Sequence, residues 1–284
     1  MTRHTAAIGA ALLSAACAGG TATQAPSPAA PRPAAAAPAA TTLRYAAGTS
    51  RYRVVTEQQL QQEVMGNVTE LSTTTTMVVT VAATSEGGNL SVAFTLDSVS
   101  FESSMPGVGA GSGLEALRGR TFTGTFEPSG RLVGMPNPDT TNPAVTQMIG
   151  ELKDFFPVLP TGSVVACASW SDTTSEDVPA GPLQMRLRAT RNHRVVGWDT
   201  TGGSRALRLA TTTNYSMEGS GEQEGQMLSI AGSGTGQLEH LVGAGGSFVS
   251  RTARDSAQMT VTVVSMGLDV PVRRTSRTTI TRLP

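Results

Sequence analysis

The chain has 284 residues, with 21 basic and 21 acidic side chains and a formal net charge of zero. A balanced charge does not indicate a polyanionic partner, and no basic stripe interleaved with aromatic residues marks a nucleic-acid site. Aromatic residues make up only 4% of the chain, so the core must be built from Val, Leu, Met and a few Phe.

The N-terminal segment 1–17 has the order of a secretory signal peptide. Arg3 and His4 precede the short apolar run AAIGAALLSAA, which cannot span a bilayer, and Cys17 follows small residues. The ending LSAAC resembles the lipobox of bacterial lipoproteins, although Ser14 stands where that family usually has Leu. The resemblance implies that Cys17 carries lipid and anchors the mature protein to a membrane. Ordinary secretion, with cleavage at a nearby site of small residues, is the alternative.

The same resemblance implies a location. Ala18 is not the Asp that commonly retains such lipoproteins on the inner membrane. We therefore expect a lipid-anchored protein of the bacterial cell envelope, on the outer membrane and facing the periplasm. A secreted or soluble periplasmic protein is the alternative.

Residues 18–41 are a low-complexity Pro/Ala segment. Prolines prevent a continuous helix there and favour the extended polyproline II conformation, with a rise of about 3.1 Å per residue. We expect a disordered tether with a reach of roughly 75 Å, followed by a folded β-rich domain over 42–284.

Long alternating strands begin after the tether. Segment 51–65 is predicted as a strand, with a helix as the alternative because EQQLQQEVM contains good helix formers. Segments 69–84 and 89–103 form the best predicted hairpin, and the alternation slips by one residue near 97–98, which indicates a β-bulge. The glycine-rich stretch 104–116 is expected to be a mobile surface loop.

Segment 143–156 is the one convincing helix of the mature chain. Asn142 is a suitable N-cap, Pro143 suits the first turn, and Pro157 ends the run. Apolar residues recur on one face at helical spacing: Val145, Met148, Ile149, Leu152 and Phe156.

Strands are predicted again after the helix. Their ranges are 164–174, 183–190 paired with 193–199, 204–217 paired with 226–239, then 246–253, 257–266 and 270–283. The pattern predicts a mainly β fold, a large curved antiparallel sheet resembling half a barrel, with the amphipathic helix packed on it. A faint internal similarity suggests two related halves, 42–140 and 160–284, and chance similarity of Thr- and Gly-rich strands is the alternative.

Several short segments resemble a family of bacterial secreted lipoproteins whose domain has no assigned function. They are YRVVTEQQLQQEVMG, SMPG, TFTGTFEPSGRLVGM, FFPVLP and RTTITRL. Where that family usually has Gly-Asp before Ser-Trp, this chain has Cys167 and Ala168. The resemblance brings no catalytic residues. In architecture alone, the chain is also similar to the periplasmic lipoprotein-carrier fold, a strongly curved sheet around helices.

The sequence does not predict a catalytic or a metal-binding site. His193 and His240 have no Cys or His at metal-ligand spacing, so both are expected at the surface or in turns. Cys167 is expected to be a small buried residue, and a disulfide with Cys17 is the alternative. We therefore expect no enzyme activity, no metal and no cofactor.

Two functions remain. The first is a binding module that holds a hydrophobic small molecule or lipid between the helix and the sheet, with loop 106–113 as a lid. The second is a structural or protein-interaction module of the envelope with a filled core. The predicted groove of the first is lined by Val145, Met148, Ile149, Leu152, Phe155 and Phe156, facing Val79, Val92 and Phe94.

Overall fold

The structure, a computed structural model, describes residues 41–105, 113–135, 143–160, 162–165, 167–180, 183–201, 204–223 and 225–284. Ala40–Pro284 form one compact unit. The predicted signal peptide, Cys17 and nearly all of the tether lie outside the described residues, as do residues 106–112 of the predicted lid.

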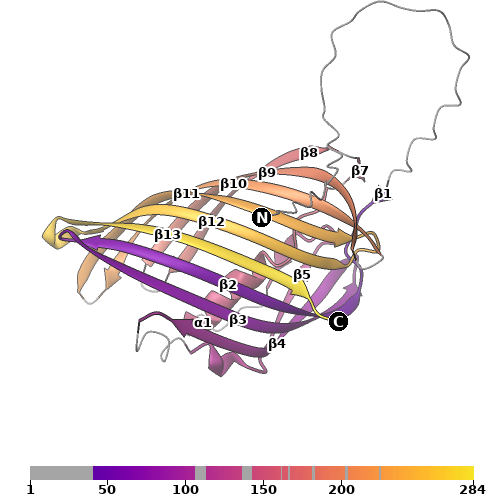
Figure 1. Cartoon of the computed structure of the whole chain (residues 1–284), viewed down its shortest axis with the longest axis horizontal. Helices are drawn as coiled ribbons and strands as arrows, with labels where there is room; N and C mark the ends of the chain where they lie inside the picture. The colour runs from indigo at the N-terminus through magenta and orange to yellow at the C-terminus, as the bar shows by residue number, and fades with distance from the viewer. Residues whose placement is uncertain are drawn as a thin grey trace, which may run out of the picture. The chain divides into compact units, whose positions relative to one another are not determined.

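The strands build one large antiparallel sheet (Figure 1). Its 11 strands are β2 (Gly48–Val64), β3 (Asn67–Glu86), β4 (Asn89–Ser103), β5 (Thr121–Phe126), β6 (Leu132–Gly134), β8 (Ser169–Ala180), β9 (Leu183–Thr201), β10 (Ser204–Gln223), β11 (Gln226–Gly243), β12 (Phe248–Val263) and β13 (Leu268–Arg282). The other elements are the helix α1 (Pro143–Lys153), two 3-10 turns (Glu115–Leu117 and Val264–Met266) and a short ribbon of β1 (Thr41–Thr42) with β7 (Ser163–Val164). The predicted mainly β, antiparallel fold is confirmed.

The order in the sheet is β6-β5-β4-β3-β2-β13-β12-β11-β10-β9-β8. Strand β2 pairs with β13, so the strands before and after the helix belong to the same sheet. Among the described strands the sheet is open, with β6 and β8 at its edges. The proposed duplication of two halves stays a prediction.

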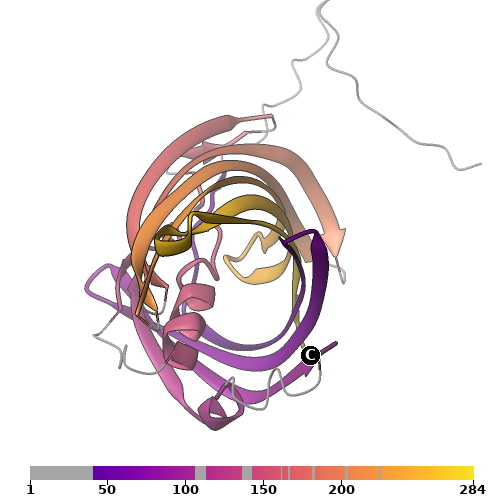
Figure 2. The same cartoon turned by 90° about the vertical axis from the view of Figure 1, so that its left-hand side faces the viewer.

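The sheet curls, and Figure 2 shows its strands curving around the space that holds α1. The helix ends at Lys153, three residues before the predicted end at Phe156. Phe156 precedes Pro157, and the proline ring disfavours the α conformation at the residue before it. The chain instead closes with a tighter turn, in which the Phe155 N–H donates to the Leu152 carbonyl at 3.2 Å.

The hairpin of β3 and β4 lies where it was predicted. Glu86 pairs with Asn89, and Gly87 and Gly88 between them have φ values of 56° and 86°. Two positive φ values suit the tight turn that matches the twist of antiparallel strands. The predicted bulge is also present, because Val78 pairs with Ser98 and Val79 with Leu96, which leaves Asp97 as the extra residue.

Two predicted strand breaks are wrong. The segments 183–190 and 193–199 form one continuous strand, β9, and 246–253 and 257–266 lie largely in one strand, β12. The polar stretches Arg191-Asn192 and Arg254-Asp255-Ser256 lie between the predicted strands. Both continue the strand alternation, with Arg191 and Asp255 facing the concave side, where they have polar partners.

The main core fills one end of the concave side, between α1, the segment that follows it, and the sheet. Phe155 lies at its centre, with ring centroids 5.2 Å from Tyr52 and 5.4 Å from both Phe94 and Phe248. These edge-to-face contacts suit aromatic rings and let a chain with few of them build a dense core. The helix therefore covers only part of the concave face.

Candidate functional site

The residues of the predicted groove lie in this packed core. Val79, Val92, Phe94, Val145, Met148, Ile149, Leu152 and Phe155 are all between 0% and 7% exposed, and Phe156 packs against them. The helix stripe thus meets the strands that were expected to face it. The structure places these side chains in contact with one another, and their assignment to a ligand groove stays a prediction.

A second, polar region occupies the concave face beyond the C-terminal end of α1. Alternate residues of a strand face the same side of a sheet, and here the inward positions of six neighbouring strands carry polar or charged groups. His193 pairs with Thr211, Arg191 with Thr213, and His240 with Arg251, so these side chains are direct cross-strand neighbours. The set consists of Asp172, Arg191, His193, Thr211, Thr213, Tyr215, His240, Arg251, Asp255 and Arg274.

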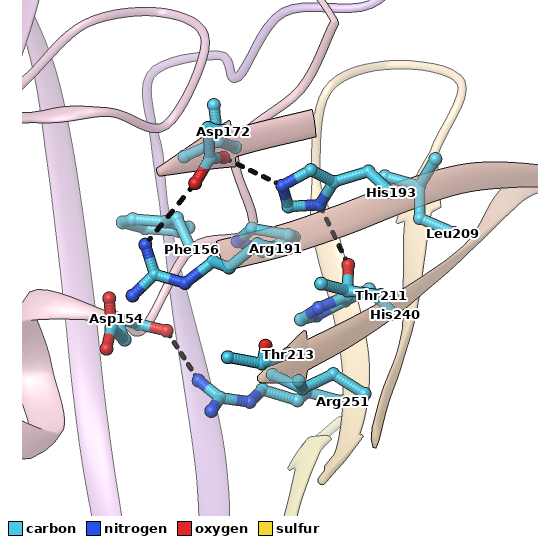
Figure 3. Close-up of a pocket in the computed structure, with 13 residues that line it drawn as sticks. Asp154, Phe156, Asp172, Arg191, His193, Leu209, Thr211, Thr213, His240 and Arg251 are labelled. Atoms are coloured by element: carbon cyan, nitrogen blue, oxygen red, sulfur yellow. Dashed lines mark hydrogen bonds and ion pairs between the residues drawn. The ribbon is translucent and has the colours of Figure 1, made fainter. Parts of the chain in front are cut away.

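The inner recess of this region is a cavity of about 90 Å³, and Figure 3 shows the residues that line it. His193 lies in its wall, and its Nε2 is 2.8 Å from the Asp172 carboxylate while its Nδ1 is 2.9 Å from the Thr211 hydroxyl. Trp170 stacks on the imidazole at a centroid distance of 5.0 Å. With Nε2 protonated, Asp172 accepts its hydrogen bond and Nδ1 accepts the Thr211 proton. Together these contacts fix the orientation of the His193 imidazole ring.

His240 and Arg251 form the other wall of the recess. His240 is 4% exposed, and its Nδ1 has no hydrogen-bond partner among the described residues. Burial, together with the nearby charge of Arg251, lowers the pKa of His240 to about 3, so the imidazole is neutral at physiological pH. Arg251 donates from Nη1 to the carbonyl of Asp154, just past the end of α1, while its buried Nε has no partner.

The outer groove continues from the recess and has a volume of about 470 Å³. The two cavities share Asp154, Arg191, Thr213, Leu238 and Arg251. Its apolar wall is formed by Met185, Leu187, Ala189, Met217, Leu238 and Ala253. The polar side comes from β2, β12 and β13 and contains Thr56, Gln58, Asp255, Arg274, Ser276 and Thr278, and the carboxylate residues Glu151 of α1 and Asp154 just after it also line the groove.

Tyr215 stands between the two walls and is held by Asp255. Its hydroxyl donates to the carboxylate at 2.8 Å, and Arg274 Nη2 pairs with the same carboxylate at 2.8 Å. Burial and the hydrogen bond to Asp255 raise the pKa of Tyr215 to about 12. The ring lies directly over Gly234 of β11, where a Cβ atom would overlap it. The glycine is therefore required by the packing of this site.

The two histidines were predicted at the surface, and this was wrong. His193 is 8% exposed and His240 is 4% exposed. Strand parity was the signal that would have placed them, because His193 has the parity of the inward Leu187 and Ala189, and His240 that of Leu238. The polarity of the histidine side chains alone had suggested that they face solvent.

Cys167 was predicted to be buried, and this was also wrong. It is exposed, with φ of 64°, in the turn that precedes β8. The prediction placed it inside a strand that in fact begins at Ser169. A positive φ is the conformation that glycine adopts most readily.

No group of three or more His, Cys, Asp or Glu side chains is arranged to hold a metal ion within the described ranges. No helix among those residues is both long and apolar enough to cross a membrane.

No family model and no curated protein matches this chain. Solved structures with partial similarity include OccK2 of Pseudomonas aeruginosa (8% identity, TM-score 0.29, 83% of this chain and 98% of that one). OmpF of Salmonella typhi, in complex with daunomycin, has 7% identity and a TM-score of 0.29 over 84% and 98% of the two chains. OmpT of Vibrio cholerae, an outer membrane protein, has 9% identity and a TM-score of 0.24 over 83% and 99%. Similarity this low extends neither the architecture nor the activity of those proteins to this chain.

Proposed function

We propose that this chain is a lipid-anchored protein of the bacterial cell envelope that binds an amphiphilic molecule, such as a lipid, in the outer groove. The anchor and the location rest on the signal-like segment, on Cys17 and on the proline-rich tether. The binding function rests on the groove, which lies next to the helix rather than beneath its apolar stripe.

The observation that carries the proposal is the two-sided lining of the groove. Its volume of about 470 Å³ is in the range of small-molecule sites. Met185, Leu187 and Met217 offer one side to a hydrocarbon chain, and methionine adapts well to chains of different shape. Arg251 and Arg274 offer the polar side. An entirely apolar ligand would leave the polar side, and Arg251 in particular, without a hydrogen-bonding partner from the ligand, so an amphiphile suits the groove better.

The proposal includes no catalysis. The Asp172–His193–Thr211 order does match the carboxylate, imidazole and hydroxyl of a nucleophilic triad. However, Thr211 is 5% exposed in the interior of β10, and its hydroxyl is occupied by His193. A substrate would have little room to approach it, and the contacts serve instead to fix the wall of the recess.

Binding is tested with a pyrene-labelled long-chain fatty acid and the delipidated protein. We expect saturable binding by the wild type, and a loss of affinity of about tenfold or more for Ala253→Trp, which places an indole in the groove. Ser256→Trp is the matched control, because Ser256 is exposed on the same strand, on the opposite face. It is expected to retain the wild-type affinity.

Absence of saturable binding by the wild type would end this proposal. The alternative would then remain, a structural or protein-interaction module of the envelope, which the dense core around Phe155 also suits. Native mass spectrometry of the purified protein provides a second measurement, since a co-purifying amphiphile is expected only for a binding protein.

A further inference from the structure

Four arginines line the outer groove, and apart from the exposed Arg254 they differ in their partners. Arg274 pairs with Asp255 at 2.8 Å, and Arg191 lies 3.7 Å from the Asp172 carboxylate. Arg251 forms no ion pair within the described part of the chain, and its hydrogen bond is to a neutral backbone carbonyl. Buried charges in proteins are normally paired, because an isolated ion is costly to remove from water. Arg251 is therefore a cation without a directly paired counter-ion, although the charges of Asp154 and Glu151 act on it from nearby.

Three buried polar atoms of residues that line the recess have no hydrogen-bond partner within the described ranges. One is Oδ1 of Asp172, which lies 3.7 Å from Arg191, and the other two are the nitrogen atoms Nε of Arg251 and Nδ1 of His240. Both residues line the same cavity of about 90 Å³, and they are directly opposite each other on β12 and β11. Buried polar atoms without partners are rare in native proteins, and two neighbouring ones call for a shared partner.

The end of α1 explains only part of this arrangement. The Asp154 carbonyl accepts from Nη1 of Arg251, which satisfies one edge of the guanidinium and places a cation near the negative end of the helix dipole. The edge that carries Nε remains, together with the imidazole of His240. A helix-capping role alone would not require a polar cavity beside that edge.

We propose that the recess holds the anionic end of the amphiphile, a singly charged group with two oxygen atoms that accepts hydrogen bonds from Arg251 Nε and His240 Nδ1. This inference rests on the proposed function, because it requires that the outer groove holds the rest of the molecule. The carboxylate of a fatty acid and the phosphodiester of a phospholipid share this chemistry. Two oxygen atoms match the donors on one edge of a guanidinium.

The expected charge of the ligand follows from the ion pairs of the neighbouring arginines. Arg191 and Arg274 each have a carboxylate within 4 Å, whereas Asp154 and Glu151 act on Arg251 without forming an ion pair with it, so Arg251 is the one of the three that a singly charged ligand can pair with directly. His240 adds a donor without adding charge, since its low pKa of about 3 keeps the imidazole neutral. The recess is large enough for a head group but not for a hydrocarbon chain, which would extend past Leu238 into the outer groove.

The experiment compares the pyrene-labelled fatty acid with the corresponding primary alcohol at a pH of about 8, where the carboxylic acid is ionised. We expect the wild type to bind the acid about 10- to 100-fold more tightly, as for one charge-assisted contact. Arg251→Gln should remove most of this preference, because it weakens binding of the acid far more than binding of the alcohol. Arg273→Gln is the matched control, because Arg273 is exposed on β13 with the opposite parity to Arg274.

The possible outcomes distinguish a failure of the anion site from a failure of the proposed binding function. Equal affinities of the wild type for acid and alcohol, as expected if water alone occupies the recess, would overturn the anion site and leave the groove. Binding of neither probe would overturn the proposed function itself. The wild-type comparison needs no variant, so it holds even if Arg251→Gln does not fold. A pyrene-labelled phosphatidylglycerol in place of the acid then shows which of the two sources, carboxylate or phosphodiester, binds more tightly.

Discussion

The buried imidazole of His240 makes the folded state sensitive to acid. Its pKa falls from 6.5 to about 3 on folding, through burial and the charges of Arg251 and His193. Between these values the unfolded chain binds more protons than the folded chain, so stability falls as the pH falls from about 6.5 towards 3. The limiting slope for one such group is about 1.4 kcal/mol per pH unit.

We expect His240→Gln to flatten this dependence. Urea denaturation of wild type and variant at a series of pH values checks it, and the difference between the two slopes isolates His240 from the carboxylates that also titrate. The slope and not the absolute value is compared, because the substitution also changes the stability at neutral pH. Parallel curves would show that folding does not lower the pKa of His240.

The backbone of Cys167 has a left-handed conformation, with φ of 64°, which destabilises the folded state. That conformation costs a residue with a Cβ atom roughly 1–2 kcal/mol, partly offset by the greater flexibility of glycine in the unfolded chain. We expect Cys167→Gly to raise the free energy of unfolding by about 0.5–1 kcal/mol. Ala168→Gly is the control, because Ala168 has no positive φ and should be destabilised instead. Thermal or urea unfolding distinguishes the two signs.

At the scale of elements, the position of the Tyr215 ring depends on a glycine of β11, Gly234. Gly234 allows the ring to approach the strand, whereas a Cβ atom at Gly236 would meet Thr213 Cβ at an ordinary distance of 3.5 Å. We therefore expect Gly234→Ala to destabilise the protein by about 1–3 kcal/mol, as overpacking does. Gly236→Ala should be neutral or slightly stabilising, since alanine restricts the unfolded chain. Equal stabilities of the two variants in urea denaturation would contradict the position of Tyr215.

The strands also show which parts of this fold a sequence can predict. The hairpin of β3 and β4 and the bulge at Asp97 followed from alternation and glycine chemistry, both of which are local. The continuous strands β9 and β12 were divided in the prediction at Arg191-Asn192 and at Arg254–Ser256. Those are the places where charged side chains face inward, and their partners come from other strands.

The candidate site was missed for the same reason. Asp172, His193 and Thr211 are brought together by the register of three strands, and no short motif in the chain encodes that register. The apolar stripe of α1 was identified from its spacing, and its burial against Phe94 could be anticipated. The spacing of apolar residues in the helix does not show how far the helix extends along the sheet. It therefore does not show which inward-facing residues of the strands the helix leaves uncovered.

At the scale of the whole domain, the concave face divides along the length of the strands. One end is filled by α1, Phe155 and Phe156, while the middle carries the polar recess and the outer groove. The boundary lies at Asp154, where the helix has just ended and its chain contacts Arg251. The same helix therefore closes the core and forms one rim of the candidate binding site.

The tether determines where that site would act, and Cys17 is the residue on which this depends. If Cys17 is lipidated, as the lipobox-like ending suggests, the full chain should be recovered in the membrane fraction. We expect Cys17→Ala to leave the signal segment uncut or to release the protein into the soluble fraction, while Cys167→Ala remains with the membrane. Mass spectrometry of the wild-type N-terminus provides the decisive measurement. A lipid-free N-terminus beyond residue 17 would exclude the anchor, and the groove would then belong to a soluble protein that reaches its amphiphile by diffusion.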